Sequence, residues 1–89
     1  MIYSQQIWRF VKVEIKKLIG LRIKELRELK GLSQKDLAYA ADLDRSYIAS
    51  IENGQRNVSI VNIEKIAIAL GVSLHELFNA EKFKKNGKI

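Results

Sequence analysis

The side chains of this chain that could carry out chemistry are few, and their spacing does not suit catalysis. His75 is the only histidine, cysteine is absent, and the five glycines are scattered singly along the chain. A metal site needs several convergent ligands, and acid–base catalysis needs a positioned group of suitable pKa. Asp42 and Asp44 flank a turn, and backbone conformation explains them better than a catalytic pair of carboxylates does. We therefore expect no enzyme activity, no metal and no cofactor.

Side chains suited to binding gather instead in the stretch SQKDLAYAADLDRSYIASIEN. Its pattern predicts two short helices joined by a tight turn. Ser33 is the expected N-cap of the first helix, with Asp36 as its capping-box partner. Asp44 can cap the second helix. The first turn of that helix then presents three polar side chains outward: Arg45, Ser46 and Tyr47.

Apolar residues in the same stretch have the spacing needed to close the two helices into a wedge. Leu37 and Ala41 lie four residues apart and share a helix face. The opposing apolar surface is expected from Leu43, Ile48 and Ile51. Ala38 matters because two helices that cross within one turn leave no room for a larger side chain at their closest approach.

The charge of the chain is concentrated at its two ends. The net charge is +6, yet residues 18–78 carry eight basic and eight acidic side chains. Residues 1–17 and residues 79–89 each carry four basic and one acidic side chain. The surplus suggests an anionic partner, but it does not single out the central domain. A chain of 89 residues forms one small domain, which association with a second copy would stabilise.

The central region resembles the lambda-repressor/Cro-like helix-turn-helix regulators from about Ile19 to Phe78. The likeness rests on the runs GLRIKELRELKGLSQKDLA, YIASIENGQRN and IEKIAIALGVSLHELF. Within that family, DRSYIASIENGQRNVS is most similar to the controller proteins of restriction-modification systems. The family usually has glycine at the turn, where this chain has Asp42. Since Asp tolerates the left-handed conformation better than most residues with a Cβ, we expect the turn to be kept.

The resemblance implies an all-α fold with a five-helix lambda-repressor-like DNA-binding domain over residues 18–78. An N-terminal extension of uncertain structure, residues 1–17, precedes it, and a basic tail, residues 79–89, follows. The implied function is sequence-specific binding of a pseudo-palindromic DNA operator by a homodimer in the cytoplasm, which controls transcription. Such a protein either excludes RNA polymerase from a promoter or recruits it.

The same resemblance implies roles for individual residues. The second helix of the motif would enter the major groove, where residues near its N-terminus reach base edges first. Four residues are expected to contact bases: Arg45, Ser46, Tyr47 and Ser50. Six others are expected to contact the DNA backbone: Gln34, Lys35, Asn53, Gln55, Arg56 and Asn57. Arg27 is implied to pair with Glu52 and so to hold the first helix against the recognition helix.

Local signals place the remaining helices. We expect the first helix from Ile19 to Lys30, with Ile23, Leu26 and Leu29 or Lys30 facing inward and Gly31 ending it. Ser59 should cap a fourth helix that ends at Gly71, with an inner stripe formed by Ile60, Ile63, Ile66, Ala67 and Leu70. A capping box from Ser73 to Glu76 should open the last helix. The resemblance places the two-fold mate there, so Leu74, Leu77 and Phe78 are the expected dimer interface.

The two ends leave alternatives open. Ile7, Val11 and Ile15 fit a helix, whereas Val11, Val13 and Ile15 alternate with charged residues as a strand would. Trp8 and Phe10 are expected to pack in the core or at a dimer contact. Charged residues interrupt the apolar run of this segment, so neither a signal peptide nor a membrane span is expected. Residues 79–89 should form a frayed basic tail. The alternative function is an antitoxin-type protein-interaction module that captures its partner through residues 1–17.

Overall fold

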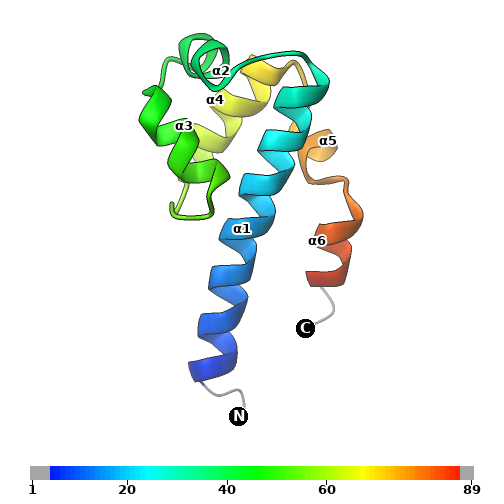
Figure 1. Ribbon diagram of the computed structural model, residues 1–89. Coiled ribbons are helices and arrows are strands. Elements are labelled where there is room, and N and C mark those ends of the chain that lie inside the picture. Colours follow the sequence, from blue (N-terminus) through cyan, green and yellow to red (C-terminus); the bar gives the residue numbers. More distant parts are fainter. Residues whose placement is uncertain (1–4, 87–89) are drawn as a thin grey trace.

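The computed structural model describes the backbone of residues 5–86 and the side chains of residues 15–84. Within residues 5–86 the chain forms only helices and turns, which confirms the all-α fold (Figure 1). The six helices are α1 (Gln5–Leu29), α2 (Gln34–Ala41), α3 (Arg45–Glu52), α4 (Ile60–Leu70), α5 (Leu74–Phe78) and α6 (Glu81–Asn86). None of the helices in this part of the chain is both long and apolar enough to cross a membrane.

The helices begin and end at the signals in the local sequence. Ser33 and Asp36 form the complete capping box at the start of α2, with both hydrogen bonds 3.0 Å long. The hydroxyls of Ser59 and Ser73 accept hydrogen bonds from backbone N–H groups in the first turns of α4 and α5. Asp44 occupies the N-cap position of α3, but its side chain makes no capping hydrogen bond, so the expected cap is wrong in that detail.

The core is formed where α1 to α5 meet, and it contains these buried apolar residues: Ile23, Leu26, Leu37, Ala38, Ala41, Ile48, Ile51, Ile63, Ile66, Ala67, Leu70, Val72 and Leu77. Three residues named for the inner stripes are instead exposed: Leu29, its alternative Lys30, and Ile60. Leu29 is 75% exposed. Residues three apart on an α-helix differ in direction by about 60°, so Leu29 points about 120° away from Ile23, which faces the core. Ile60 is 68% exposed, because it opens α4 and the core residues of that helix begin at Ile63.

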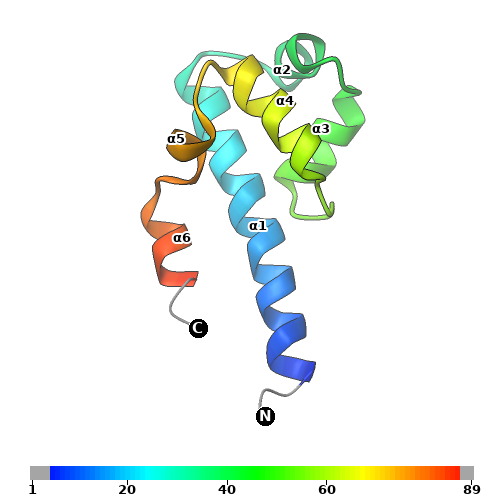
Figure 2. The same cartoon turned by 180° about the vertical axis from the view of Figure 1, so that it is seen from behind.

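The first helix is longer than expected. It runs without a break through most of the N-terminal extension, so residues 5–17 are helical and the boundary expected at residue 17 falls inside α1. The N-terminal half of α1 projects beyond α2, α3 and α4 (Figures 1 and 2). Helix α6 lies beside the middle of α1 in both views. The side chains of Trp8 and Phe10 lie outside the described residues, and their packing stays a prediction.

The C-terminal segment also differs from expectation, because residues 81–86 form α6 rather than a frayed tail. The ring of Phe83 meets the ring of Phe78 edge-on, with 5.3 Å between ring centroids. The Lys82 ammonium lies 3.3 Å from the Glu25 carboxylate on α1. These contacts join α6 to α5 and α1, and the partners Lys82 and Glu25 are 57 residues apart in the sequence.

Candidate nucleic-acid interface

The turn between α2 and α3 determines how the second of these helices is presented. Asp42 adopts the left-handed conformation with φ of 57°, as expected where the family has glycine. The next N–H, that of Leu43, donates to the carbonyl oxygen of Ala38 at 2.9 Å. Ala38 itself is buried, which lets α2 and α3 approach closely. One face of α3 therefore packs into the core, and the opposite face is left at the surface.

The ion pair expected between Arg27 and Glu52 is present. Nε of Arg27 donates to Oε2 of Glu52 at 2.7 Å, and Nη2 donates to Oε1 at 3.0 Å. Both side chains are buried, and this hydrogen bonding to the carboxylate raises the pKa of Arg27. The remaining polar atoms are also satisfied, since Nη1 of Arg27 donates to the Leu32 carbonyl oxygen at 2.7 Å. The pair joins α1 to the C-terminal end of α3.

Gln34 belongs to the same cluster. Its side-chain amide donates to Oε1 of Glu52 at 3.0 Å, so the side chain is anchored inside the protein. The backbone N–H expected to face a phosphate belongs to the first residue of α2. A helix N-terminus favours an anion through its free N–H groups and its dipole. One carboxylate thus holds α1, α2 and α3 in a single arrangement.

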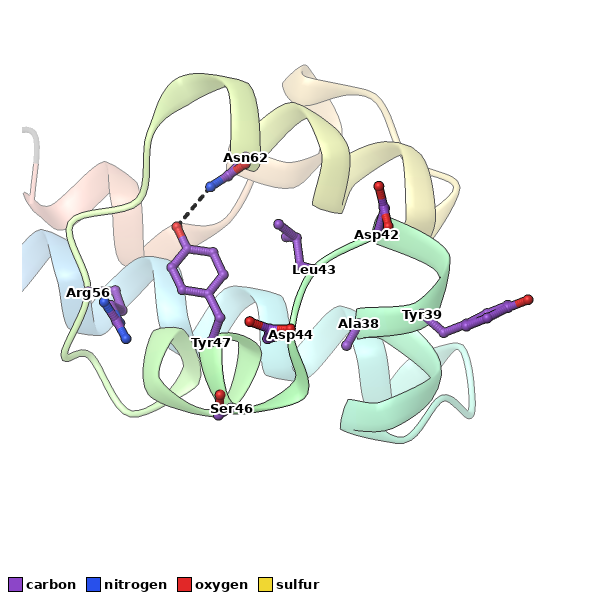
Figure 3. A pocket seen from close by; sticks show the side chains of 9 residues that line it. All are labelled: Ala38, Tyr39, Asp42, Leu43, Asp44, Ser46, Tyr47, Arg56 and Asn62. Atoms are coloured by element: carbon purple, nitrogen blue, oxygen red, sulfur yellow. Dashed lines mark hydrogen bonds between the residues drawn. The ribbon is translucent and has the colours of Figure 1, made fainter.

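The four expected base-contacting residues do not lie in the same environment. Arg45 and Ser46 are exposed on the first turn of α3. Tyr47 is half-buried against the core, and its hydroxyl accepts a hydrogen bond from Nδ2 of Asn62 at 3.0 Å (Figure 3). Ser50 is half-buried, and its hydroxyl donates to the Tyr47 carbonyl oxygen at 2.8 Å. Only the first two residues project freely into solvent.

A loop residue completes this arrangement. Nε of Arg56 donates to the hydroxyl of Ser50 at 3.0 Å, and the Arg56 guanidinium carbon lies 5.3 Å from the centroid of the Tyr47 ring. A cation at this distance from a tyrosine ring is attracted by the negative face of the ring. Sequence reasoning missed Asn62, because it is a polar residue in the first turn of α4 and nothing in its spacing links it to Tyr47. Only the packing of α4 beside α3 brings the two together.

The residues expected to contact the DNA backbone lie at two places beside α3. Five of them are exposed, one in the first turn of α2 and four at the end of α3 or in the loop after it: Lys35, Asn53, Gln55, Arg56 and Asn57. Gly54 begins this loop with φ of 76°, a value that favours glycine. The loop passes directly against α1, because a Cβ on Gly54 would lie 2.9 Å from Cγ of Lys17.

An open cavity of about 590 Å³ lies between α2, α3 and α4 (Figure 3). Its lining includes Asp42 and Asp44 from the turn, Ser46 and Tyr47 from α3, and Asn62 from α4. The mixture of acidic, basic and neutral polar groups makes this an open polar groove rather than an apolar ligand pocket.

The expected dimer interface needs one correction. Leu77 is 1% exposed and belongs to the core of the single chain, so it cannot contact a mate. Its buried position follows from Arg22 of α1, which draws α5 inward by donating to the carbonyl oxygens of Leu77 and Glu76 at 2.8 Å. The other two residues remain available, because Leu74 is 38% exposed and Phe78 is 37% exposed.

The comparisons with known proteins agree with this geometry. A family model described as helix-turn-helix matches residues 23–77. The control protein C.MunI of a Mycoplasma species is 54% identical over 67 residues, which are 74% of this chain and 90% of that protein. The crystal structure of the restriction-modification controller protein C.AhdI from Aeromonas hydrophila matches with a TM-score of 0.69 and 54% identity, over 71% of this chain and 96% of that chain.

A third similar structure contains DNA. It is the tetramer of the restriction-modification controller protein C.Esp1396I in complex with its natural 35 base-pair operator. It matches with a TM-score of 0.71 and 39% identity, over 80% of this chain and 91% of that chain. The fold, the matched family model and these relatives confirm the resemblance found in the sequence. The chain belongs to the helix-turn-helix family of DNA-binding regulators, in which restriction-modification controller proteins are its close relatives.

Proposed function

We propose that this protein is a restriction-modification controller, which binds a pseudo-palindromic operator as a homodimer and so regulates transcription in the cytoplasm. The observation that best supports the proposal is the first turn of α3. It carries Arg45 and Ser46 at the surface, while the buried pair of Arg27 and Glu52 holds the other end of the helix. A rigid helix with exposed hydrogen-bonding groups near its N-terminus suits insertion into the major groove.

The proposed base contacts come from this turn and the one after it. Arg45 can donate two hydrogen bonds to O6 and N7 of guanine. Ser46 can donate to or accept from several bases, and Tyr47 and Ser50 contact the groove from their half-buried positions. Exposed polar residues on either side of α3 would bind phosphates and set the register of the protein on DNA. These are the N–H of Gln34 and the side chains of Lys35, Asn53, Gln55, Arg56 and Asn57.

A two-fold operator requires two copies whose recognition helices lie about 34 Å apart, which is one turn of duplex. Leu74 and Phe78 of α5 are the proposed centre of the dimer interface. Val61 and Ile68 lie seven residues apart on one face of α4 and are both largely exposed, so they would extend this surface. By occupying a promoter, the dimer would either exclude RNA polymerase or recruit it.

The test is operator binding to the DNA upstream of the protein's own gene, located by footprinting. Arg45→Ala should weaken operator binding by about tenfold or more, as expected for loss of a bidentate guanine contact. It should leave binding to unrelated DNA nearly unchanged. Lys84→Ala is the matched control, because it removes an exposed positive charge on α6, away from α3.

The salt dependence supplies an independent measurement. The logarithm of the binding constant should fall linearly with the logarithm of salt concentration, with a slope of about −0.9 for each phosphate neutralised. The groove assignment is wrong if binding is insensitive both to salt and to Arg45→Ala. An intact footprint combined with full tolerance of Arg45→Ala would instead show that another surface reads the operator.

A further inference from the structure

Tyr47 is the only expected base-contacting residue whose polar side-chain atom is bound by another helix. Its hydroxyl oxygen accepts a hydrogen bond from Nδ2 of Asn62 on α4, at 3.0 Å. Figure 3 shows the ring with Asn62 beyond its hydroxyl and Arg56 to one side. The guanidinium of Arg56 lies 5.3 Å from the ring centroid, and the body of the ring packs against the core. The position of this side chain is therefore set before DNA arrives.

We propose that Asn62 is a positioning residue that determines which chemical groups of DNA Tyr47 can contact. The inference rests on the proposed function and assigns a role to a residue outside α3 and outside the loop that follows it. The direction of the hydrogen bond between Asn62 and Tyr47 determines this role. An amide N–H can only donate, so the phenol oxygen of Tyr47 serves as the acceptor. The phenol hydrogen then points elsewhere.

That direction restricts the partner of Tyr47. With its oxygen engaged by Asn62, the hydroxyl approaches DNA as a donor, and its partner must be an acceptor. In the major groove the acceptors are O6 and N7 of guanine, N7 of adenine and O4 of thymine. The amino groups of cytosine and adenine are donors and do not match. Asn62 therefore makes Tyr47 select for acceptors without touching DNA itself.

The side chain of Asn62 can be removed without disturbing the N-cap of α4. The backbone N–H of Asn62 donates to the hydroxyl of Ser59 at 3.1 Å, which is the N-cap interaction of the helix. Asn62→Ala keeps that backbone hydrogen bond and removes only the amide that contacts Tyr47. Alanine is also the better helix former. The variant should therefore fold as the parent does, and thermal unfolding checks this.

A double-mutant cycle tests the proposal on the intact protein. Operator affinity is measured at one salt concentration for the parent, Asn62→Ala, Tyr47→Phe and the double variant. Asn62→Ala should weaken binding about three- to tenfold, the range expected for one positioned hydrogen bond. In the Tyr47→Phe background the same change should have almost no effect, because the hydroxyl through which Asn62 acts is gone. Asn79→Ala removes an exposed amide elsewhere and is the matched control.

Base substitution across the operator gives the second readout. At one base pair, substitution should no longer change the affinity of Tyr47→Phe. The affinity of Asn62→Ala should be insensitive to substitution at the same base pair, and that pair should present a hydrogen-bond acceptor to the major groove. Equal losses from Asn62→Ala in both backgrounds, or relaxed discrimination at a different base pair, would overturn the inference. Arg45→Ala distinguishes failure of the proposed function from failure of the role assigned to Asn62. If that variant loses operator binding while the cycle shows no coupling, the proposed function stands and only the role of Asn62 fails.

Discussion

Glu52 connects the C-terminal end of α3 to two other helices. Its carboxylate accepts hydrogen bonds from Arg27 and Gln34, which come from two other helices. Removing one member of a buried ion pair is costly, because the other charge then stays buried without a partner. The net gain from such a pair is much smaller, since both charges had to lose their hydration. The pair contributes more to geometry than to overall stability.

We expect Arg27→Met to reduce the free energy of unfolding by about 3–5 kcal/mol, because Glu52 would be left buried and unpaired. The double variant Arg27→Met with Glu52→Leu should recover much of that loss. Urea unfolding followed by circular dichroism measures both. Glu81→Ala is the control, because it breaks an exposed pair with Lys84 and should cost less than about 1 kcal/mol. Equal losses in the two single variants would contradict the special role of the buried pair.

Among the elements, α1 and α3 approach each other closely at Gly20. A Cβ on Gly20 would clash with the carbonyl oxygen of Ile51 and would lie 2.9 Å from that of Glu52. Both obstacles are backbone atoms at the C-terminal end of the recognition helix, so neither can rotate away as a side chain could. The glycine is therefore needed for helix packing, although glycine lowers the stability of a helix interior.

Gly20→Ala should destabilise the protein by about 2 kcal/mol or more, even though alanine favours the helix by about 1 kcal/mol. The reason is that α1 and α3 must separate to admit the methyl group. Lys24→Ala, at an exposed position one turn further along α1, is the matched control and should be nearly neutral. Thermal unfolding of the two variants is the measurement. A Gly20→Ala variant as stable as the parent would show that the two helices can move apart freely.

At the scale of the whole molecule, the proposed function depends on a second copy. Half-sites one duplex turn apart can be occupied together only if the dimer fixes both recognition helices. The proposed interface uses α4 and α5, where exposed apolar side chains follow each other along the chain. Large apolar residues on a small surface often mark a protein contact. The proposed interface no longer includes Leu77, which is buried in the core, and keeps Leu74 and Phe78, which are partly exposed.

Ile68→Lys should convert the dimer to a monomer without unfolding it, because Ile68 is 71% exposed in the single chain. Operator affinity should fall by about tenfold or more, as the two half-sites would no longer be bound together. Sedimentation equilibrium and operator titration measure the two effects. Leu29→Lys is the matched control, because Leu29 is equally exposed but lies on α1. The proposed interface is wrong if both variants remain dimeric.

Removal of residues 1–14 tests the contribution of the projecting part of α1. These residues carry two basic and one acidic side chain. We expect operator affinity to change by no more than about threefold, since a net charge of +1 is lost and the salt slope depends on phosphates neutralised. A larger loss would make this segment part of the DNA interface. Unchanged DNA binding with loss of a protein partner would favour the antitoxin-type alternative.

Much of the architecture could be predicted from the sequence, because its determinants are local. The capping box at Ser33, the turn at Asp42 and the glycines that end helices act within one or two turns of chain. The periodic apolar residues of α2, α3 and α4 predicted most of the core. Predictions failed where the local pattern was ambiguous. Leu29 and Ile60 fit an apolar stripe by their spacing, but Leu29 is rotated away from the core face of α1, and Ile60 precedes the first core residue of α4.

The sequence by itself determined α2 to α5, the C-terminal half of α1, the family and the short segment from which DNA contacts would come. Only the tertiary structure decided how those residues are held. Packing brought Asn62 to Tyr47 and Arg56 to Ser50, placed Leu77 in the core, and joined α6 to α1 through Lys82 and Glu25. The physical reason is the separation in sequence between the residues that interact. Caps and helical periods depend on residues a few positions apart, whereas these contacts depend on how separate helices pack, and no local pattern encodes which side chains will then meet.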